Sequence, residues 1–241
     1  MEVNSFVPKR SDMQIAEYSI SHPDSLSVNE LLYAATLTDD LNTKKQIYAN
    51  AMRLYPASWE PVVNAAGVEL ELGNTDEAKA LLDKASTMNS NSYELQTNLA
   101  SYYSKMGDYK TAETYLVKAK SLGADVDYNL GIIYINNGKY PEAVNALRDA
   151  KCDFNLGLAQ LLNKEFSAAE TTFNCIDPKD SESYYLLAVT GARMDDKEKT
   201  FGYLTESIKL DSTVKMKAST DREFFKYYND PDFRTLVGIT Q

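Results

Sequence analysis

Apolar and small residues recur along this chain at spacings of three and four, the period of one face of an α-helix. Between these stretches stand glycines such as Gly107 and Gly138. A helix commonly ends at a glycine, because only glycine readily adopts the left-handed conformation needed there. The chain has 10 Gly and 7 Pro, most of them between the helical stretches. The pattern therefore predicts an all-α protein.

One helix–turn–helix pattern occurs repeatedly. Residues 98–119 read N-L-A-x-x-Y-x-x-x-G-x-Y-x-x-A-x-x-x-L-x-x-A, and residues 129–150 repeat this order with Gly131 in place of the first Ala. Related versions begin at Asn64 and Asn155. Small residues in both helices let the two backbones approach closely. Such a pair cannot bury its apolar face alone, so neighbouring pairs are predicted to stack.

Two details of the second helices can be predicted locally. Pro141 is expected to open a second helix in its first turn, where the missing N–H costs nothing. Ser167 and Glu170 have the spacing of a capping box at the equivalent point of a later unit.

Residues 25–211 resemble the tetratricopeptide repeat (TPR) superfamily. The resemblance implies a right-handed superhelical solenoid of about six helix pairs with capping helices at both ends. Counted between equivalent positions of the second helices, from Lys44 to Thr200, successive units are 34, 34, 31, 26 and 31 residues apart. The predicted units are 25–58, 59–92, 93–123, 124–149, 150–180 and 181–211.

Both ends of the chain are predicted to cap the solenoid. In the N-terminal segment 1–24, residues 12–20 are expected to form one helix before a turn, and residues 1–9 are expected to be mobile. In segment 212–241, the aromatic residues around Phe224 and Phe233 indicate one or two short helices over the last unit.

A finer resemblance rests on four segments, namely 27–32, 51–56, 189–193 and 221–233. Together they are similar to the C-terminal TPR region of OmpA-family outer-membrane proteins of Gram-negative bacteria. This resemblance implies a periplasmic interaction module associated with the outer membrane. A cytoplasmic TPR adaptor or regulator that binds a peptide is the alternative, and an enzyme acting on the cell wall is a third.

The net charge of −10, from 35 acidic and 25 basic residues, disfavours nucleic acid and anionic membranes as partners. No apolar run is long enough to cross a membrane. A protein or peptide of neutral or basic character is therefore the expected partner.

The sequence offers no recognisable arrangement of catalytic residues. His22 is the only histidine and stands beside Pro23 in a predicted turn. No glycine-rich phosphate loop, calcium loop or metal-ligand cluster is present. We predict no catalytic residue, no metal and no cofactor, and expect a protein that is not an enzyme.

Cys152 and Cys175 are expected at adjacent ends of the two helices of the fifth unit. Two free thiols are the favoured interpretation. A disulfide is the alternative, and it requires α-carbons within about 7 Å.

The concave face, lined by the first helices, is the predicted binding surface. An amide offers both a donor and an acceptor, so a row of asparagines could hold an extended peptide backbone. The alternative is that these amides only cap or solvate the helices. The row consists of Asn64, Asn98, Asn129 and Asn155.

In the second half the inner positions are apolar and include Tyr128, Phe154 and Tyr185. They either form a partner site or pack against one another as core, and core is the preferred interpretation. The lysines of a chaperone-type carboxylate clamp are absent. Their expected positions hold Asn29, Val63, Thr97, Tyr128 and Phe154.

Overall fold

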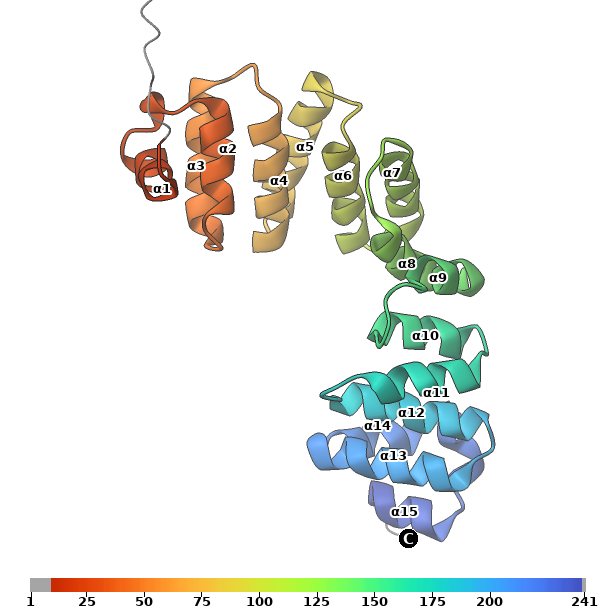
Figure 1. The fold of residues 1–241 in the computed structure, drawn as a ribbon. Coiled ribbons are helices and arrows are strands. Elements are labelled where there is room, and N and C mark those ends of the chain that lie inside the picture. Colours follow the sequence, from red (N-terminus) through yellow and green to blue (C-terminus); the bar gives the residue numbers. More distant parts are fainter. Residues whose placement is uncertain (1–9, 240–241) are drawn as a thin grey trace, which may run out of the picture. The chain divides into compact units, whose positions relative to one another are not determined.

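A computed structural model describes residues 10–239, and every regular element in that range is helical (Figure 1). The prediction for residues 1–9 lies outside the described residues. The chain divides into two compact units, residues 1–126 and 127–241, and each is described by itself.

The first unit is a row of helices that pack on their neighbours in chain order (Figure 1). Three helix pairs follow an N-terminal helix and a 3₁₀ turn. The elements are α1 (Asp12–Ser21), η1 (Pro23–Ser25), α2 (Val28–Thr36), α3 (Leu41–Leu54), α4 (Glu60–Leu72), α5 (Thr75–Met88), α6 (Tyr93–Lys105) and α7 (Tyr109–Ser121).

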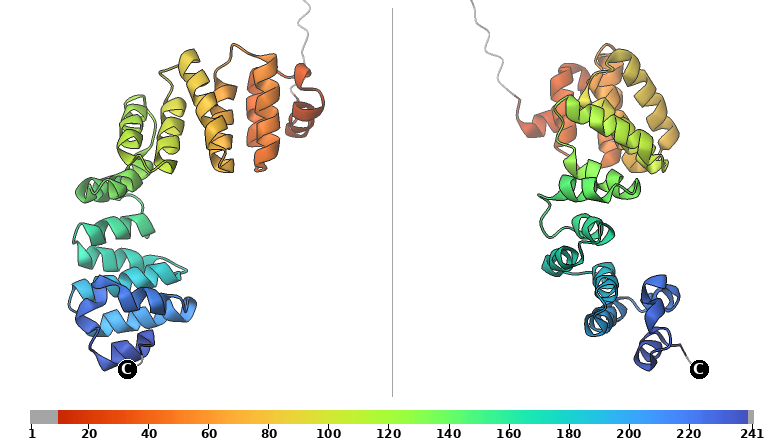
Figure 2. Two further views of the ribbon diagram at one scale, coloured as in Figure 1. Left: turned by 180° about the vertical axis from the view of Figure 1, so that it is seen from behind. Right: turned by 90° about the vertical axis from the view of Figure 1, so that its right-hand side faces the viewer.

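The second unit contains three further pairs and a C-terminal group of short helices (Figure 2). The elements are α8 (Asp127–Asn136), α9 (Tyr140–Leu147), α10 (Phe154–Leu162), α11 (Phe166–Cys175), α12 (Ser181–Arg193), α13 (Lys197–Leu210), α14 (Val214–Thr220), η2 (Arg222–Tyr227) and α15 (Pro231–Val237).

The two helices of every pair are joined by only two to four residues, so they pack antiparallel. Each residue range predicted for a repeat unit contains one of these pairs. Gly73, Gly107 and Gly138 adopt φ values of 82°, 76° and 73°, which is the left-handed conformation expected at the end of a first helix. Pro141 lies in the first turn of α9, as predicted.

The predicted capping box at Ser167 and Glu170 is wrong. Ser167 lies inside helix α11, which begins at Phe166. The N-cap is Glu165, two residues before Ser167, and its side chain makes no capping bond. Capping boxes form instead at the starts of α1 and α2. There Ser11 pairs with Gln14, and Ser27 pairs with Glu30.

Small residues bring the helices of a pair into close contact. A Cβ atom added to Gly131 would lie 2.4 Å from Leu147 Cγ, and one added to Gly157 would lie 2.7 Å from the Phe173 ring. Phe173 is fully buried. Atoms at such distances must move, so the large residue of the second helix occupies the space that the missing side chain leaves.

The ends of the repeat array are covered. Helix α1 packs on α2 and α3. At the other end, Phe224 and Phe233 are fully buried and lie 5.9 Å apart between ring centroids. This C-terminal group has three short helical elements rather than one or two.

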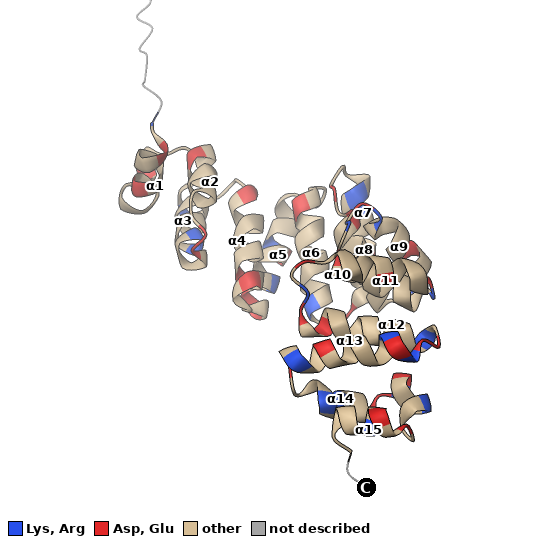
Figure 3. Cartoon of the chain, turned by 60° about the horizontal axis from the view of Figure 1, so that its bottom comes forward, with Lys and Arg blue, Asp and Glu red and all other residues tan. Residues whose placement is uncertain are grey.

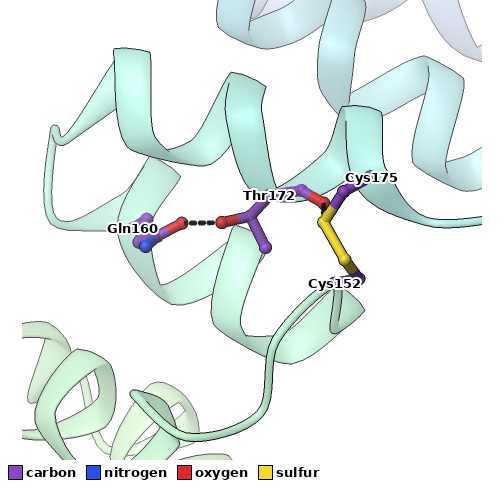
Figure 4. Close-up of a disulfide and its surroundings, with 4 residues drawn as sticks. All are labelled: Cys152, Gln160, Thr172 and Cys175. Atoms are coloured by element: carbon purple, nitrogen blue, oxygen red, sulfur yellow. Dashed lines mark hydrogen bonds between the residues drawn. A yellow bond between two sulfur atoms is a disulfide. The ribbon is translucent and has the colours of Figure 1, made fainter.

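Cys152 and Cys175 form a disulfide, so the favoured prediction of free thiols is wrong (Figure 4). Their α-carbons lie 5.1 Å apart, within the range a disulfide requires. The bond ties the loop before α10 to the last residue of α11. Beside it, Thr172 Oγ1 donates a 2.7 Å hydrogen bond to Gln160 Oε1 and joins the same two helices.

We expect Gly157→Ala to lower the free energy of unfolding by roughly 1–3 kcal/mol, the usual cost of overpacking. The added methyl group would collide with the buried Phe173 ring. Urea denaturation followed by circular dichroism measures the change. Gly202→Ala is the matched control, because a Cβ at that helical glycine meets no atom within 4 Å. Equal stability of Gly157→Ala and wild type would contradict the packing described above.

Candidate functional site

In both units, some first helices of successive pairs contact one another. Helix α6 contacts α4 in the first unit, and α10 contacts both α8 and α12 in the second. We call the exposed residues of α2, α4 and α6, and separately those of α8 and α10, the first-helix surfaces. The residues predicted to bind a peptide lie on these first helices.

In the first unit, the predicted asparagines make contacts within the fold. Asn98 Nδ2 donates a 2.8 Å hydrogen bond to the Val63 carbonyl oxygen, and so links α6 to α4. Gly67 makes room for this amide, since a Cβ there would lie 3.3 Å from Asn98 Nδ2. The Asn64 side chain hydrogen-bonds Tyr48, whose pKa is raised mainly by burial.

In the second unit, a polar cluster joins α8 to the start of α10. Asn155 Nδ2 donates to the Tyr128 hydroxyl at 2.9 Å, and that hydroxyl donates to Asp153 Oδ2 at 3.0 Å. The other carboxylate oxygen of Asp153 accepts from the backbone N–H groups of Asn155 and Leu156, which caps α10. We call Tyr128, Asp153 and Asn155 the Tyr128 cluster.

The Tyr128 ring remains accessible, with 43% of the residue exposed. Partial burial raises the pKa of its hydroxyl; the hydrogen bond from Asn155 opposes this shift and the one to Asp153 adds to it. The phenol therefore stays protonated near neutral pH and continues to donate to Asp153. The adjacent Asn129 is exposed, and no hydrogen bond of its side chain is found among residues 10–239.

The apolar inner positions of the second unit are largely enclosed. Phe154 and Leu158 are half-buried and pack against a cluster that includes Phe173. Leu161 and Val189 are buried within that cluster. These residues contribute to the core between helix pairs.

Tyr185 is only 2% exposed, because the C-terminal segment covers it. Its hydroxyl donates to Asp221, its ring lies 5.7 Å from that of Phe224, and the Lys217 ammonium stands 3.9 Å from its ring centroid. Burial and the bond to Asp221 raise the pKa of this phenol.

The same C-terminal segment covers the end of α12. Arg193 forms a bidentate ion pair with Glu223, with N···O distances of 2.9 and 2.6 Å. Lys226 donates to the Ala192 carbonyl oxygen and pairs with Asp195. Element η2 therefore occupies the inner face of α12, and the open first-helix surface of this unit is confined to α8 and α10.

No group of three or more potential metal ligands occurs within residues 10–239. His22 ends α1, where its ring nitrogen lies 3.0 Å from the Ser21 hydroxyl and its ring packs edge-on to Tyr18. None of the described helices is both long and apolar enough to cross a bilayer.

Charged residues are unevenly distributed over the second unit (Figure 3). Helix α10 has none and α11 has only Glu170, whereas α13 carries both signs. The Tyr128 cluster is therefore bordered by a largely uncharged pair of helices. This environment suits recognition of a neutral segment through hydrogen bonds and apolar contact.

Sequence reasoning identified Tyr128 and Asn155 separately but missed Asp153. The available signal was an aspartate directly before the helical stretch, which is a preferred N-cap. Its second role, as acceptor for Tyr128 from the previous pair, depends on how the pairs stack.

The comparison with known families supports the repeat assignment. A tetratricopeptide repeat family model matches residues 93–123. BBSome complex member BBS4 of Bos taurus is 26% identical over 189 residues. The match covers 73% of this chain and 36% of BBS4, so the chain spans about a third of that protein's length.

Solved structures share the fold. YrrB, described as a TPR protein with an unusual peptide-binding site, has a TM-score of 0.60 at 22% identity, over 68% of this chain and 92% of YrrB. Pseudomonas aeruginosa PilF has a TM-score of 0.60 at 14% identity, over 90% of this chain and 96% of PilF. The repeat match and the shared fold support the TPR superfamily and an all-α TPR superhelix.

We expect Asn98→Ala to lower the free energy of unfolding by about 1 kcal/mol, because it removes the hydrogen bond between α6 and α4. Asn129→Ala is expected to change it by less than about 0.5 kcal/mol, as an exposed substitution does. Chemical denaturation of both variants checks this. Equal stability of the two variants would contradict the structural role of Asn98.

Proposed function

We propose that this chain, a repeat protein of the tetratricopeptide type, is a non-catalytic interaction module that binds an extended segment of a partner protein. The proposed site is the first-helix surface of α8 and α10. The observation that carries the proposal is the Tyr128 cluster with the exposed Asn129 beside it.

The cluster is suited to binding because its aromatic ring is already held in place. The Tyr128 hydroxyl is fixed by Asn155 and Asp153, yet the ring remains open to solvent. Binding to an ordered side chain loses less conformational entropy than binding to a free one. The ring can pack on an apolar side chain, while the Asn129 amide can both donate to and accept from a peptide backbone.

The predicted row of four asparagines is thereby reduced to one free amide. Asn98 and Asn155 donate to partners within the fold, and Asn64 is held by Tyr48. We therefore do not propose that a row of four equivalent amides holds the peptide. YrrB has the same fold and a described peptide-binding site, which supports a peptide as the class of ligand.

We further propose that the module lies in an oxidising compartment, as the periplasmic, outer-membrane-associated part of an OmpA-like protein. Its support is the disulfide between Cys152 and Cys175, both exposed, because such bonds persist in the periplasm and are reduced in the cytosol. A cytoplasmic adaptor remains the alternative.

We expect peptides selected from a displayed library of random linear sequences to bind the purified chain through the Tyr128 cluster. Tyr128→Ala and Asn129→Ala are each expected to weaken binding about fivefold, which corresponds to roughly 1 kcal/mol for one lost hydrogen bond or contact. Isothermal titration calorimetry measures the affinities.

Met216→Ala is the matched control, because Met216 is 75% exposed on α14, away from α8 and α10. It should leave the affinity unchanged. Failure to select any peptide, or unchanged affinity in both test variants, would contradict the proposed site.

The compartment is tested by trapping thiols in intact cells that produce the protein naturally. After acid quenching, a maleimide–polyethylene glycol reagent should add to neither cysteine unless a reductant is supplied first. It should then add twice. Two additions without reductant would favour the cytoplasmic alternative.

A further inference from the structure

Gly202 is the one glycine within the described helices that close packing does not require. Gly131, Gly157 and Gly191 each face an atom that would lie within 3.0 Å of an added Cβ, and Gly67 faces the Asn98 amide. Gly202, in the middle of α13, faces open space and is exposed. Glycine destabilises a helix interior relative to alanine, so packing and helix propensity both leave Gly202 unexplained.

Gly202 is one of the residues that line a hollow of about 570 Å³ over α13. Tyr184 of α12 and Tyr203 of α13 contribute aromatic rings, and Lys199 also lines it. Three carboxylates complete the lining, from Asp196, Glu198 and Glu206. We call this the Gly202 hollow; its volume lies within the range of small-ligand sites.

The Tyr203 ring is held in a fixed orientation. Its hydroxyl donates to Glu170 Oε1 at 3.3 Å and accepts from Asn174 Nδ2 at 3.1 Å, both on α11. Lys179 Nζ lies 6.0 Å from the centroid of the Tyr184 ring, so an incoming cation would share this ring with Lys179. Both rings line the hollow, and the face of a tyrosine ring attracts a positively charged group.

The charge of the lining is negative. Lys199, its one basic residue, is paired with Glu170 at 2.7 Å, and Glu170 lies outside the hollow. Glu206 makes only a solvent-exposed pair with Lys209 on its own helix, and such pairs are weak. Glu198 is exposed, and no ion pair to it is found among residues 10–239.

We propose that the Gly202 hollow binds an arginine side chain from an extended segment of a partner protein. A guanidinium group is planar, stacks on tyrosine and binds carboxylates through two parallel hydrogen bonds. It thus matches two tyrosines and two available glutamates better than a compact ammonium group does. The net charge of −10 also favours approach of a basic segment.

This site is independent of the proposed first-helix surface. It is built on α13, the second helix of its pair, with one ring from α12, whereas the Tyr128 cluster lies on α8 and α10. Loss of arginine binding would leave the binding measured at Tyr128 and Asn129 unaffected, so the two proposals fail separately.

The probe is the fluorescein-labelled peptide Gly-Ser-Arg-Gly-Ser with blocked ends, compared with the same peptide containing citrulline, the neutral isostere of arginine. In fluorescence anisotropy at 50 mM NaCl, the arginine peptide is expected to bind at least tenfold tighter. Glu198→Gln with Glu206→Gln should remove most of this difference. Equal binding of the two peptides to wild type would overturn the proposal.

A control variant that loses two carboxylates elsewhere distinguishes binding at the hollow from attraction by the net charge of the chain. Asp76→Asn with Glu77→Gln changes the charge by the same amount at the exposed first turn of α5, far along the chain from α13. This control should retain the full arginine preference. If it weakens binding as much as the variant of the hollow does, the attraction is non-specific and the proposal is wrong.

Two substitutions of Gly202 are expected to act differently, one by raising stability and the other by weakening binding of the arginine peptide. Gly202→Ala is expected to raise the melting temperature by about 2–4 °C, because alanine favours the helix and meets no neighbour. Gly202→Leu should place a bulky side chain in the hollow and weaken binding of the arginine peptide at least tenfold while the chain stays folded. A folded Gly202→Leu variant with wild-type affinity would contradict the assignment.

Discussion

The close approach of the two helices within each pair is the constraint on which the rest of this structure depends. A first helix can lie directly against a second helix only where a residue at the contact is small, as Gly131 is beside Leu147 and Gly157 is beside Phe173. This contact fixes the rotation of each helix about its axis. It thereby determines which residues meet the next pair and which remain on the first-helix surface.

Much of the fold could be predicted from sequence because this constraint leaves a periodic pattern. Small and large residues at fixed spacing indicated the helix pairs, and glycines such as Gly107 and Gly138 indicated where first helices end. The capping box predicted at Ser167 is wrong, because the N-cap of α11 is Glu165, two residues earlier. The disulfide was only the alternative prediction, because the spacing of two cysteines along the chain does not determine the distance between them in the fold.

The site was less predictable, because a repeated residue type does not reveal how each copy is used. Asn64, Asn98, Asn129 and Asn155 occupy equivalent positions, but neighbouring pairs differ. The Asn98 amide donates a hydrogen bond to a backbone carbonyl of α4, and the Asn155 amide donates one to the Tyr128 hydroxyl. The Asn129 amide stays exposed. Tyr185 stands at an inner position by register, where core was the preferred interpretation, and it is buried by a segment distant in sequence.

Two surfaces of different chemistry follow from the same architecture. Near α8 and α10 the exposed groups are an aromatic ring and an amide, with few charges on the adjoining helices. On α13 the exposed groups are carboxylates and tyrosines around a glycine that packing does not require. A module with both surfaces could hold one partner segment by hydrogen bonds and apolar contact and another by charge.

The most direct measurement is nuclear magnetic resonance of the isotope-labelled chain titrated with a selected peptide. If a peptide binds the first-helix surface of the second unit, the amide signals of α8 and of the start of α10 should shift most, including the Asn129 side-chain amide. Signals of α4 and α6, where Asn98 is bound within the fold, should stay in place. Shifts confined to the first unit or to the C-terminal helices would contradict the central claim.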